Sequence, residues 1–284
     1  MSYKIVTDST CDITNEMKSW KNFEIVPLTL QIDDYIIADD ENFDQDDFVA
    51  RVAKSNSVAK SACPSPSAFA KAMEGDEDED YVITITDKLS GSYNSAVQGK
   101  ALYEDEHNDG KKIYVFNSLA TSGTPALIAQ KIKEVCDSGM KFDEVVPYIN
   151  DYIANHCELY FCLDSLDALK RNGRLFALAA SLLEKIHLKL ICKAKEGNIS
   201  PVGKDMTINR AVMKMAKMIA ELVAGQDLSD KKLIVSHVCC EERANLLADK
   251  ITEKANFGTV EILKCSGLNT LYASNGGIIV CFEK

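Results

Sequence analysis

The sequence predicts an α/β fold built as two domains, and three observations support this. Apolar runs typical of strands alternate with helical patterns through the first half of the chain, an order that favours parallel βαβ units. A second apolar run, at residues 158–163, begins a further series of strands and helices. The length of 284 residues exceeds the usual size of one domain. We therefore expect an N-terminal domain over residues 1–157 and a C-terminal domain over residues 158–284.

The expected elements follow the apolar periodicity of the chain. In the first half, strands are expected at residues 4–7, 24–32, 81–85 and 112–117, and helices at 44–54, 67–73, 93–103, 125–137 and 142–155. In the second half, strands are expected at 158–163, 188–194, 198–202, 232–237, 259–264 and 277–282, and helices at 177–185, 207–223 and 241–254. A short helix after residue 165 is expected to end at Gly173, because glycine readily adopts the left-handed conformation that closes helices.

The charge of the chain argues against nucleic acid as a partner. The formal net charge is −11, whereas non-specific nucleic-acid binding depends on Lys and Arg. The acidic run at 74–80 indicates a solvated loop rather than a metal site, because consecutive carboxylates repel one another and cannot all face one ion.

The composition also favours a cytoplasmic protein. No signal-peptide pattern opens the chain, and no apolar run reaches the about 18 residues of a membrane span. The ten cysteines are scattered without the spacing of zinc or thioredoxin motifs. We expect reduced thiols, no structural metal and no stable membrane insertion.

Three hydroxyl-rich loops stand at comparable places in the predicted fold. Residues 90–96 (SGSYNSA) lie where a strand passes into a helix, residues 7–12 (TDSTCD) follow the first strand, and residues 61–66 (SACPSP) precede a helix. Because ligands of open α/β sheets bind beyond the carboxyl ends of strands, we expect the three loops to meet at one pocket. Ser90 and Ser92 would supply donors to a carboxylate or phosphate at a helix N-terminus, unless one of them is simply the N-cap.

Other chemistries find less support in the residues. No Gly-rich phosphate loop or dinucleotide fingerprint is present. A serine nucleophile needs a base, and His237 is the best placed histidine, although a capping or surface role is commoner for a lone histidine. Asp8 and Asp12 could act as paired carboxylates, but such residues more often close turns and cap helices. Hydroxyls and amides without an evident base favour a site that holds an acid over one that cuts a bond.

In this order, the loops resemble those of the DegV family, bacterial fatty-acid-binding proteins that present acyl chains to a separate fatty acid kinase. The resemblance rests on residues 5–12, 26–28, 61–66, 90–96, 169–175 and 197–204. It implies a DegV-like fold with a mainly parallel sheet in the N-terminal domain and a mixed α/β C-terminal domain. It also implies one buried long-chain fatty acid as the ligand, with no other cofactor and no catalytic residue.

The resemblance implies a set of carboxylate-binding residues. Ser61 stands where the family has its carboxylate-binding Thr, and Ser90 stands at the family's Ser, followed by Gly91 and Ser92 of the same motif. Near the C-terminus, Tyr272 replaces the family's His. Its hydroxyl can donate a hydrogen bond, but its larger ring changes the shape of the head-group site.

The resemblance further implies how a kinase would dock. Arg174 matches a basic docking residue of the family, and Arg171 lies beside it in the sequence. Besides Tyr272, two residues depart from the family pattern. Met206 replaces an Arg, which weakens the case for docking on the usual kinase, and Cys63 replaces a Gln.

A lipid ligand requires a long apolar tunnel. The small and flexible side chains of 177–183 and of Met213, Met215 and Met218 are suitable, although ordinary core packing explains each methionine more simply. An acyl chain of about sixteen carbons would gain about 0.8 kcal/mol per methylene, so that burial dominates affinity and the hydroxyls set orientation.

Three functional hypotheses remain open at this point. The first is a fatty-acid-binding protein that delivers a carboxylate to a kinase. The second is a hydrolase or transferase with Ser90 or Ser92 as nucleophile and His237 or Tyr272 as proton acceptor. The third is a regulatory binding protein for another amphipathic acid, which the departures at Tyr272 and Met206 make plausible.

Overall fold

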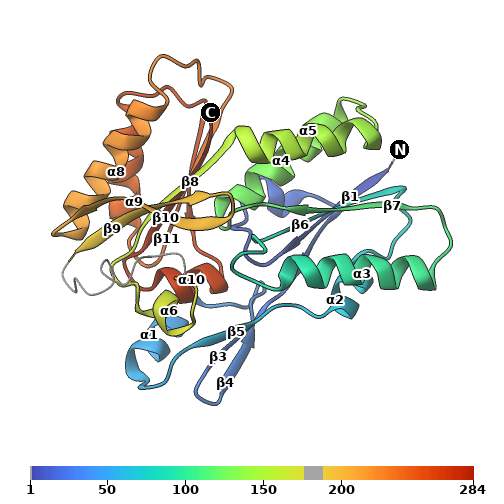
Figure 1. Cartoon of the computed structure of the whole chain (residues 1–284), viewed down its shortest axis with the longest axis horizontal. Helices are drawn as coiled ribbons and strands as arrows, with labels where there is room; N and C mark the ends of the chain where they lie inside the picture. Colours follow the sequence, from blue (N-terminus) through green and yellow to red (C-terminus); the bar gives the residue numbers. More distant parts are fainter. Residues whose placement is uncertain (1, 176–187) are drawn as a thin grey trace.

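The first sheet has four strands and is parallel throughout. In the computed structural model, which describes residues 2–175 and 188–284, its order is β2 (Phe23–Val26), β1 (Tyr3–Asp8), β6 (Glu79–Thr84) and β7 (Lys112–Asn117). Parallel neighbours need long crossover connections, and the helices α2 (Pro66–Ala72) and α3 (Ser92–Glu106) supply two of them on one face of the sheet. The predicted parallel sheet of the N-terminal half is confirmed (Figure 1).

The second sheet is mixed and has six strands. Its order is β10 (Asn198–Asp205), β9 (Lys189–Lys195), β8 (Cys157–Cys162), β13 (Ile278–Glu283), β11 (Lys232–His237) and β12 (Thr259–Lys264). The β11–β12 pair is parallel and the other pairs are antiparallel, which confirms the predicted mixed sheet. Helices α8 (Ile208–Leu222) and α9 (Glu241–Thr252) pack together against this sheet, on the left in Figure 1.

Two helices between the sheets join the halves of the molecule. Both α4 (Gly123–Asp137) and α5 (Phe142–Asn155) contact strands of the parallel and the mixed sheet (Figure 1). The approach is close at Gly123, where a Cβ atom would lie 2.8 Å from Cγ2 of Ile234 and 3.1 Å from Cβ of Cys281. One hydrophobic core therefore spans both sheets, and the expected domain boundary after residue 157 stays a prediction.

A small antiparallel sheet lies beside these layers. Its order is β4 (Tyr35–Ala38), β3 (Thr29–Ile32) and β5 (Lys60–Ala62). The segment 24–32, expected as one strand, forms β2 and β3 separately, because Pro27 has no N–H for a strand ladder. The remaining elements are the 3-10 helix η1 (Met17–Ser19) and the helices α1 (Gln45–Lys54), α6 (Asp167–Arg171) and α10 (Gly267–Ala273). The helix expected at 177–185 lies outside the described residues.

The methionines of α8 belong to the core. Met215 is fully buried in the cluster between α8, α9 and the mixed sheet, and Met213 and Met218 pack against that cluster. Core packing, the simpler interpretation of these residues, is the one the structure supports.

The last two residues of the acidic run at 74–80 are buried in the fold. Glu79 and Asp80 are the first residues of β6 and are only 4% and 0% exposed, so the expected solvated loop is wrong for these two. The Asp80 Oδ2 atom lies 3.4 Å from the Nζ atom of the equally buried Lys111. Pairing with this lysine allows a carboxylate to lie buried at the start of an inner strand.

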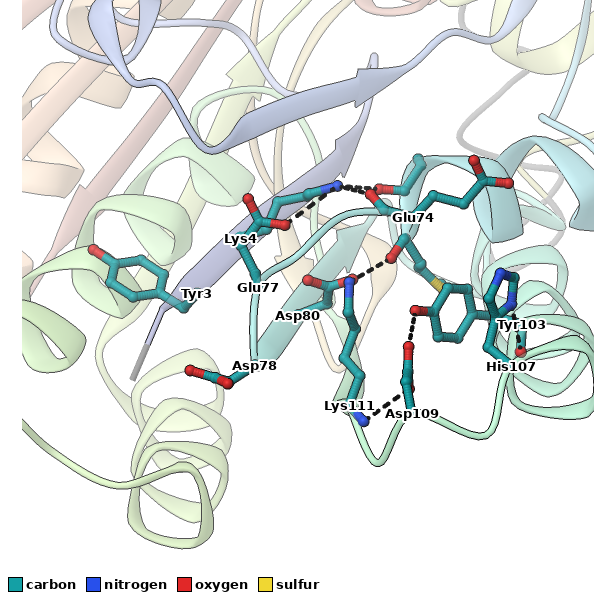
Figure 2. Close-up of polar contacts among 12 residues, drawn as sticks. Tyr3, Lys4, Glu74, Glu77, Asp78, Asp80, Tyr103, His107, Asp109 and Lys111 are labelled. Carbon is teal, nitrogen blue, oxygen red and sulfur yellow. Dashed lines mark hydrogen bonds and ion pairs between the residues drawn. The ribbon is translucent and has the colours of Figure 1, made fainter.

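Two buried lysines anchor the C-terminal end of α2, as Figure 2 shows. Lys4 Nζ donates to the carbonyl oxygen of Ala72 at 3.1 Å and to that of Glu74, while Lys111 Nζ donates to the carbonyl oxygen of Met73 at 2.7 Å. The last carbonyls of a helix lack intrahelical partners and carry a partial negative charge, so ammonium groups stabilise this end. The N-terminal end of α2 continues directly from the loop at 61–66, so contacts that fix this helix also help to fix that loop.

The buried pair of Asp80 and Lys111 predicts that the stability of the protein depends on pH. Burial raises the pKa of the Asp80 carboxyl from 3.8 to about 6, against the opposing charges of Lys111 and Lys4. Between these values the folded protein retains a proton that the unfolded chain has lost. The free energy of unfolding should therefore fall as pH rises through this window, by up to about 3 kcal/mol.

Urea denaturation of the wild type and of Asp80→Asn, which stays neutral, measures this effect. The wild type should lose stability relative to the variant as pH rises from about 4 to about 6. Glu74→Gln, at an exposed position, serves as the control. A difference between wild type and Asp80→Asn that does not change with pH would contradict the expectation.

Candidate functional site

A cavity of about 330 Å³ lies beyond the carboxyl ends of β6 and β7, against the mixed sheet. Its wall is mainly apolar and draws on both halves of the chain: Leu89, Leu119, Leu159, Phe161, Leu163, Leu169, Ile199, Leu268 and Ile279. The volume and the apolar lining are typical of a site for a small organic ligand. The position agrees with the rule that ligands of open α/β sheets bind beyond the strand ends.

Four of the polar side chains that line this cavity come from four separate segments. Ser61 lies on β5, Ser90 precedes α3, Arg174 follows α6, and Tyr272 lies on α10. The hydroxyl oxygens of Ser61 and Tyr272 are 3.2 Å apart, and the Arg174 guanidinium carbon lies 5.9 Å from the centre of the Tyr272 ring. The fold thus brings together residues that are as much as 211 positions apart in the sequence.

The start of α3 is a second part of the polar wall. Gly91 is the N-cap residue, and the Ser90 hydroxyl oxygen accepts the Ser92 N–H at 3.2 Å. The alternative that Ser90 or Ser92 is the N-cap is therefore wrong, whereas Ser90 does line the cavity as expected. A Cβ atom at Gly91 would lie 3.3 Å from the Cys63 sulfur, which shows how closely this loop meets the loop at 61–66.

Ser92 has a different place from its neighbours. It is 0% exposed, it is not among the cavity-lining residues, and its hydroxyl donates to Asp8 Oδ2 at 2.6 Å. Its position indicates a role in supporting the loop from behind.

The first hydroxyl-rich loop lies one layer deeper than expected. Asp8 is fully buried and also accepts hydrogen bonds from the Thr10 hydroxyl at 2.6 Å and the Ile85 N–H at 3.0 Å. Burial raises the pKa of the Asp8 carboxyl, and the hydrogen bonds oppose this rise. No residue of 7–12 lines the cavity, so the expectation that all three loops meet at the pocket is wrong for this one. The bond to Thr10 fits the turn-closing role considered for Asp8.

The helix α10 was not expected from the sequence, yet it forms one wall. Leu268, Asn269, Tyr272 and Ala273 all line the cavity. The helical spacing of Leu268, Leu271 and Tyr272 is a signal that could have revealed this helix. Its short length, seven residues, makes the pattern weak.

The remaining candidate residues lie outside the cavity. Arg171 is exposed on α6, and Met206 is 60% exposed after β10. His237 is 3% exposed, burial lowers the pKa of its imidazole, and its Nδ1 atom accepts the Cys240 N–H at 3.3 Å. The structure does not bring His237 to Ser90, so the hydrolase hypothesis gains no geometric support from it.

The described residues contain neither a cluster of metal ligands nor a helix suited to a membrane. In residues 2–175 and 188–284, no three His, Cys, Asp or Glu side chains are grouped so that they could hold a metal ion. Within the same ranges, none of the helices combines the length and the apolar character that crossing a membrane requires. All ten cysteines are free thiols.

The fold and the cavity together define a class: two-sheet α/β proteins with an apolar chamber between the sheets. Residues 2–284 match the model of a protein family that is described as the uncharacterised DegV family. The chain belongs to the DegV family. A DegV domain-containing protein of Streptococcus gordonii is 32% identical over 287 residues, covering 100% of this chain and 99% of the relative.

Solved structures of family members superpose closely on this fold. The protein from Ruminococcus gnavus, refined with vaccenic acid, is 39% identical with a TM-score of 0.93 and 99% coverage of both chains. A Eubacterium eligens protein loaded with heptadecanoic acid is 30% identical, with a TM-score of 0.88 and 100% coverage of both chains. The Fatty Acid Kinase (Fak) B3 protein of Streptococcus pneumoniae, loaded with linoleic acid, is 30% identical, with a TM-score of 0.89 and coverage of 100% and 99%.

The buried contact of Ser92 predicts a structural effect. Ser92→Ala removes a hydrogen-bond donor from the buried Asp8 carboxylate and should lower the free energy of unfolding by about 1–3 kcal/mol. Ser90→Ala, at a half-buried position, should cost less. Urea denaturation of both variants tests this, and equal stability of the two would contradict it.

Proposed function

We propose that this protein binds one long-chain fatty acid in the cavity and presents its carboxylate to a fatty acid kinase. The observation that carries the proposal is the cavity itself, an apolar chamber with hydroxyl groups and one guanidinium in its wall. The support from relatives is direct, because the proteins at 39% and 30% identity hold vaccenic, heptadecanoic and linoleic acid. Burial of the acyl chain would supply most of the affinity.

The polar wall would hold the carboxylate. Ser61, Ser90 and Tyr272 offer hydroxyl donors, and Gly91 leaves the backbone at the start of α3 open to the ligand. Arg174 offers a charge, and a carboxylate near a guanidinium gains a charge-assisted interaction. In this proposal Ser92 supports the loop from below rather than touching the acid.

The kinase partner is supported by the Streptococcus pneumoniae relative, whose name includes fatty acid kinase. Arg174, expected as a docking residue, lines the cavity, whereas Arg171, the last residue of α6 and three positions earlier, is exposed and is the proposed docking residue. Met206, exposed where the family pattern has Arg, places more of the docking on Arg171. A cytoplasmic location fits this partner and the ten free thiols.

Removal of both serine hydroxyls tests the carboxylate site. The double variant Ser61→Ala and Ser90→Ala should bind oleic acid about 10- to 100-fold more weakly, the loss expected for one or two hydrogen bonds to a charged group. Isothermal titration calorimetry with delipidated protein measures the affinity. Ser57→Ala with Ser229→Ala, two exposed serines outside the cavity, is the matched control.

The outcomes separate the hypotheses. Native mass spectrometry of protein purified from a bacterial host should show a bound acid, and added fatty acid should raise the melting temperature. Empty protein whose melting temperature does not respond to any chain length would refute fatty-acid binding. Unchanged affinity of the double variant would refute only the assignment of the carboxylate site.

The docking proposal predicts a separate effect on phosphorylation. Arg171→Ala should leave acid binding unchanged but slow acyl phosphate formation by about tenfold in a reconstitution with a fatty acid kinase and ATP, because a charged contact with the kinase is lost. Arg51→Ala, at an exposed position on α1, is the control. If no acyl phosphate forms with any chain length, a regulatory role for another amphipathic acid is favoured.

A further inference from the structure

The helix that carries Tyr272 is held by side chains from the opposite half of the chain. Oδ1 of Asp39 accepts the N–H of Gly267 at 2.6 Å, and Oδ2 accepts the N–H of Leu268 at 2.9 Å. These are the first two residues of α10. Asp39 follows β4, while α10 lies more than 200 residues later, before the last strand.

This joint is closely packed and has little freedom. Asp39 is 4% exposed, and its Oδ2 atom also accepts the Ser9 hydroxyl at 2.9 Å. A Cβ atom at Gly267 would lie 2.6 Å from Asp39 Oδ1 and 2.6 Å from Cδ1 of Leu30. The backbone of α10 therefore lies directly on the carboxylate, and no larger residue fits at Gly267.

Two further side chains hold the same segment. Asp12 accepts the Ser266 N–H at 2.7 Å and the side-chain amide of Asn269 at 2.9 Å. The Gln45 amide donates to the Thr270 hydroxyl at 3.0 Å. These contacts would keep α10 packed in place when Asp39 is altered. A change at Asp39 should therefore shift the helix slightly rather than unfold it.

The position of α10 determines the position of the Tyr272 hydroxyl. Tyr272 lies in the same short helix as Gly267 and Leu268, and its hydroxyl oxygen is 3.2 Å from that of Ser61. A hydrogen bond tolerates only a few tenths of an ångström of displacement, so a small shift of the first turn would break the pair.

We propose that Asp39 is a positioning residue of the carboxylate site: its ionised carboxylate seats α10 so that Tyr272 meets Ser61, and protonation of Asp39 loosens the hold on a bound acid. The inference rests on the proposed function in one respect, the assignment of Tyr272 to the carboxylate. When Asp39 takes up a proton, one of its oxygens becomes a donor. The neutral carboxyl group accepts weaker hydrogen bonds and carries a proton of its own, so the bonds from Gly267, Leu268 and Ser9 weaken or rearrange.

The burial of Asp39 places its protonation near neutral pH. Burial raises the pKa of the Asp39 carboxyl to about 7, the hydrogen bonds from Leu268, Gly267 and Ser9 oppose the rise, and the charge of Asp12 adds to it. Of the other titratable groups nearby, His237 has its pKa lowered by burial, and burial raises the pKa of the Cys265 thiol well above 9.0. Of these three groups, Asp39 has the pKa nearest to 7, so its protonation is the change expected between pH 8 and pH 6.

The experiment measures dissociation of a dansyl-labelled undecanoic acid by stopped-flow fluorescence. From about pH 8 to about pH 6 the wild type should release the probe about tenfold faster, the effect of one lost hydrogen bond to a charged group. Asp39→Asn should release it fast at both pH values. Asp40→Asn, the neighbouring carboxylate that accepts only from Asn42, is the matched control and should behave as the wild type.

A third variant tests the link through the tyrosine. Tyr272→Phe keeps the ring but lacks the hydroxyl, so its release of the probe should be fast and should not change over the same pH range. The proposal is overturned if Asp39→Asn retains the wild-type pH profile, or if Tyr272→Phe retains it in full. Titration of the probe's own carboxyl is common to all variants and cancels in the comparison.

A measurement on the wild type alone covers the case in which Asp39→Asn does not fold. Hydrogen exchange of the peptide over residues 265–273, corrected for the intrinsic pH effect, should lose protection from about pH 8 to about pH 6, whereas peptides of β13 should not. Unchanged protection of α10 would overturn the proposal. Because this needs no ligand, a failure of fatty-acid binding itself would be recognised separately.

Discussion

Three buried carboxylates hold the loops around the cavity, and the rest of the site depends on them. Asp8, Asp12 and Asp39 are 0%, 1% and 4% exposed. Asp8 is the last residue of β1, and Asp12 and Asp39 lie in the segments that follow β1 and β4. Their hydrogen-bond partners are backbone N–H groups, hydroxyls and one side-chain amide. A buried carboxylate without such donors costs several kcal/mol, so any rearrangement that separates a loop from its partner is strongly opposed.

The hydrogen bonds to these carboxylates also explain how a strained stretch of backbone beside the cavity is maintained. Leu119 and Ser122, which follow β7, have φ values of 54° and 63°, a sparsely populated backbone region that costs a non-glycine residue about 1–3 kcal/mol. The Ser122 N–H donates to the carbonyl oxygen of Thr10 at 3.0 Å, and the Ser122 hydroxyl donates to Asp12. The same carboxylate thus fixes α10 on one side and the strained turn on the other, and Leu119 is held in the cavity wall.

The regular elements of the fold could be predicted because their signals are local. Residues 112–117 and 142–155 form β7 and α5 with the expected bounds, since each pattern is set by a few neighbouring apolar side chains. The strands β4 and β5 were missed, because they are short and are stabilised by pairing with β3 rather than by their own sequence. The single strand expected at 24–32 was wrong for a related reason, since only the tertiary pairing shows that the chain changes sheets at Pro27.

The candidate site divides in the same way. The alternation of strands and helices, the hydroxyl-rich loops with Ser61 and Ser90, and the resemblance to the DegV family could all be predicted, because each is contained in a contiguous motif. The burial of Ser92 against Asp8, the supporting role of the first loop and the contact of Tyr272 with Ser61 could not, because they arise only when the chain folds. Ser92 and Asp8 are 84 positions apart, and Ser61 and Tyr272 are 211 positions apart. No local pattern in a chain encodes which distant donor will satisfy a buried acceptor.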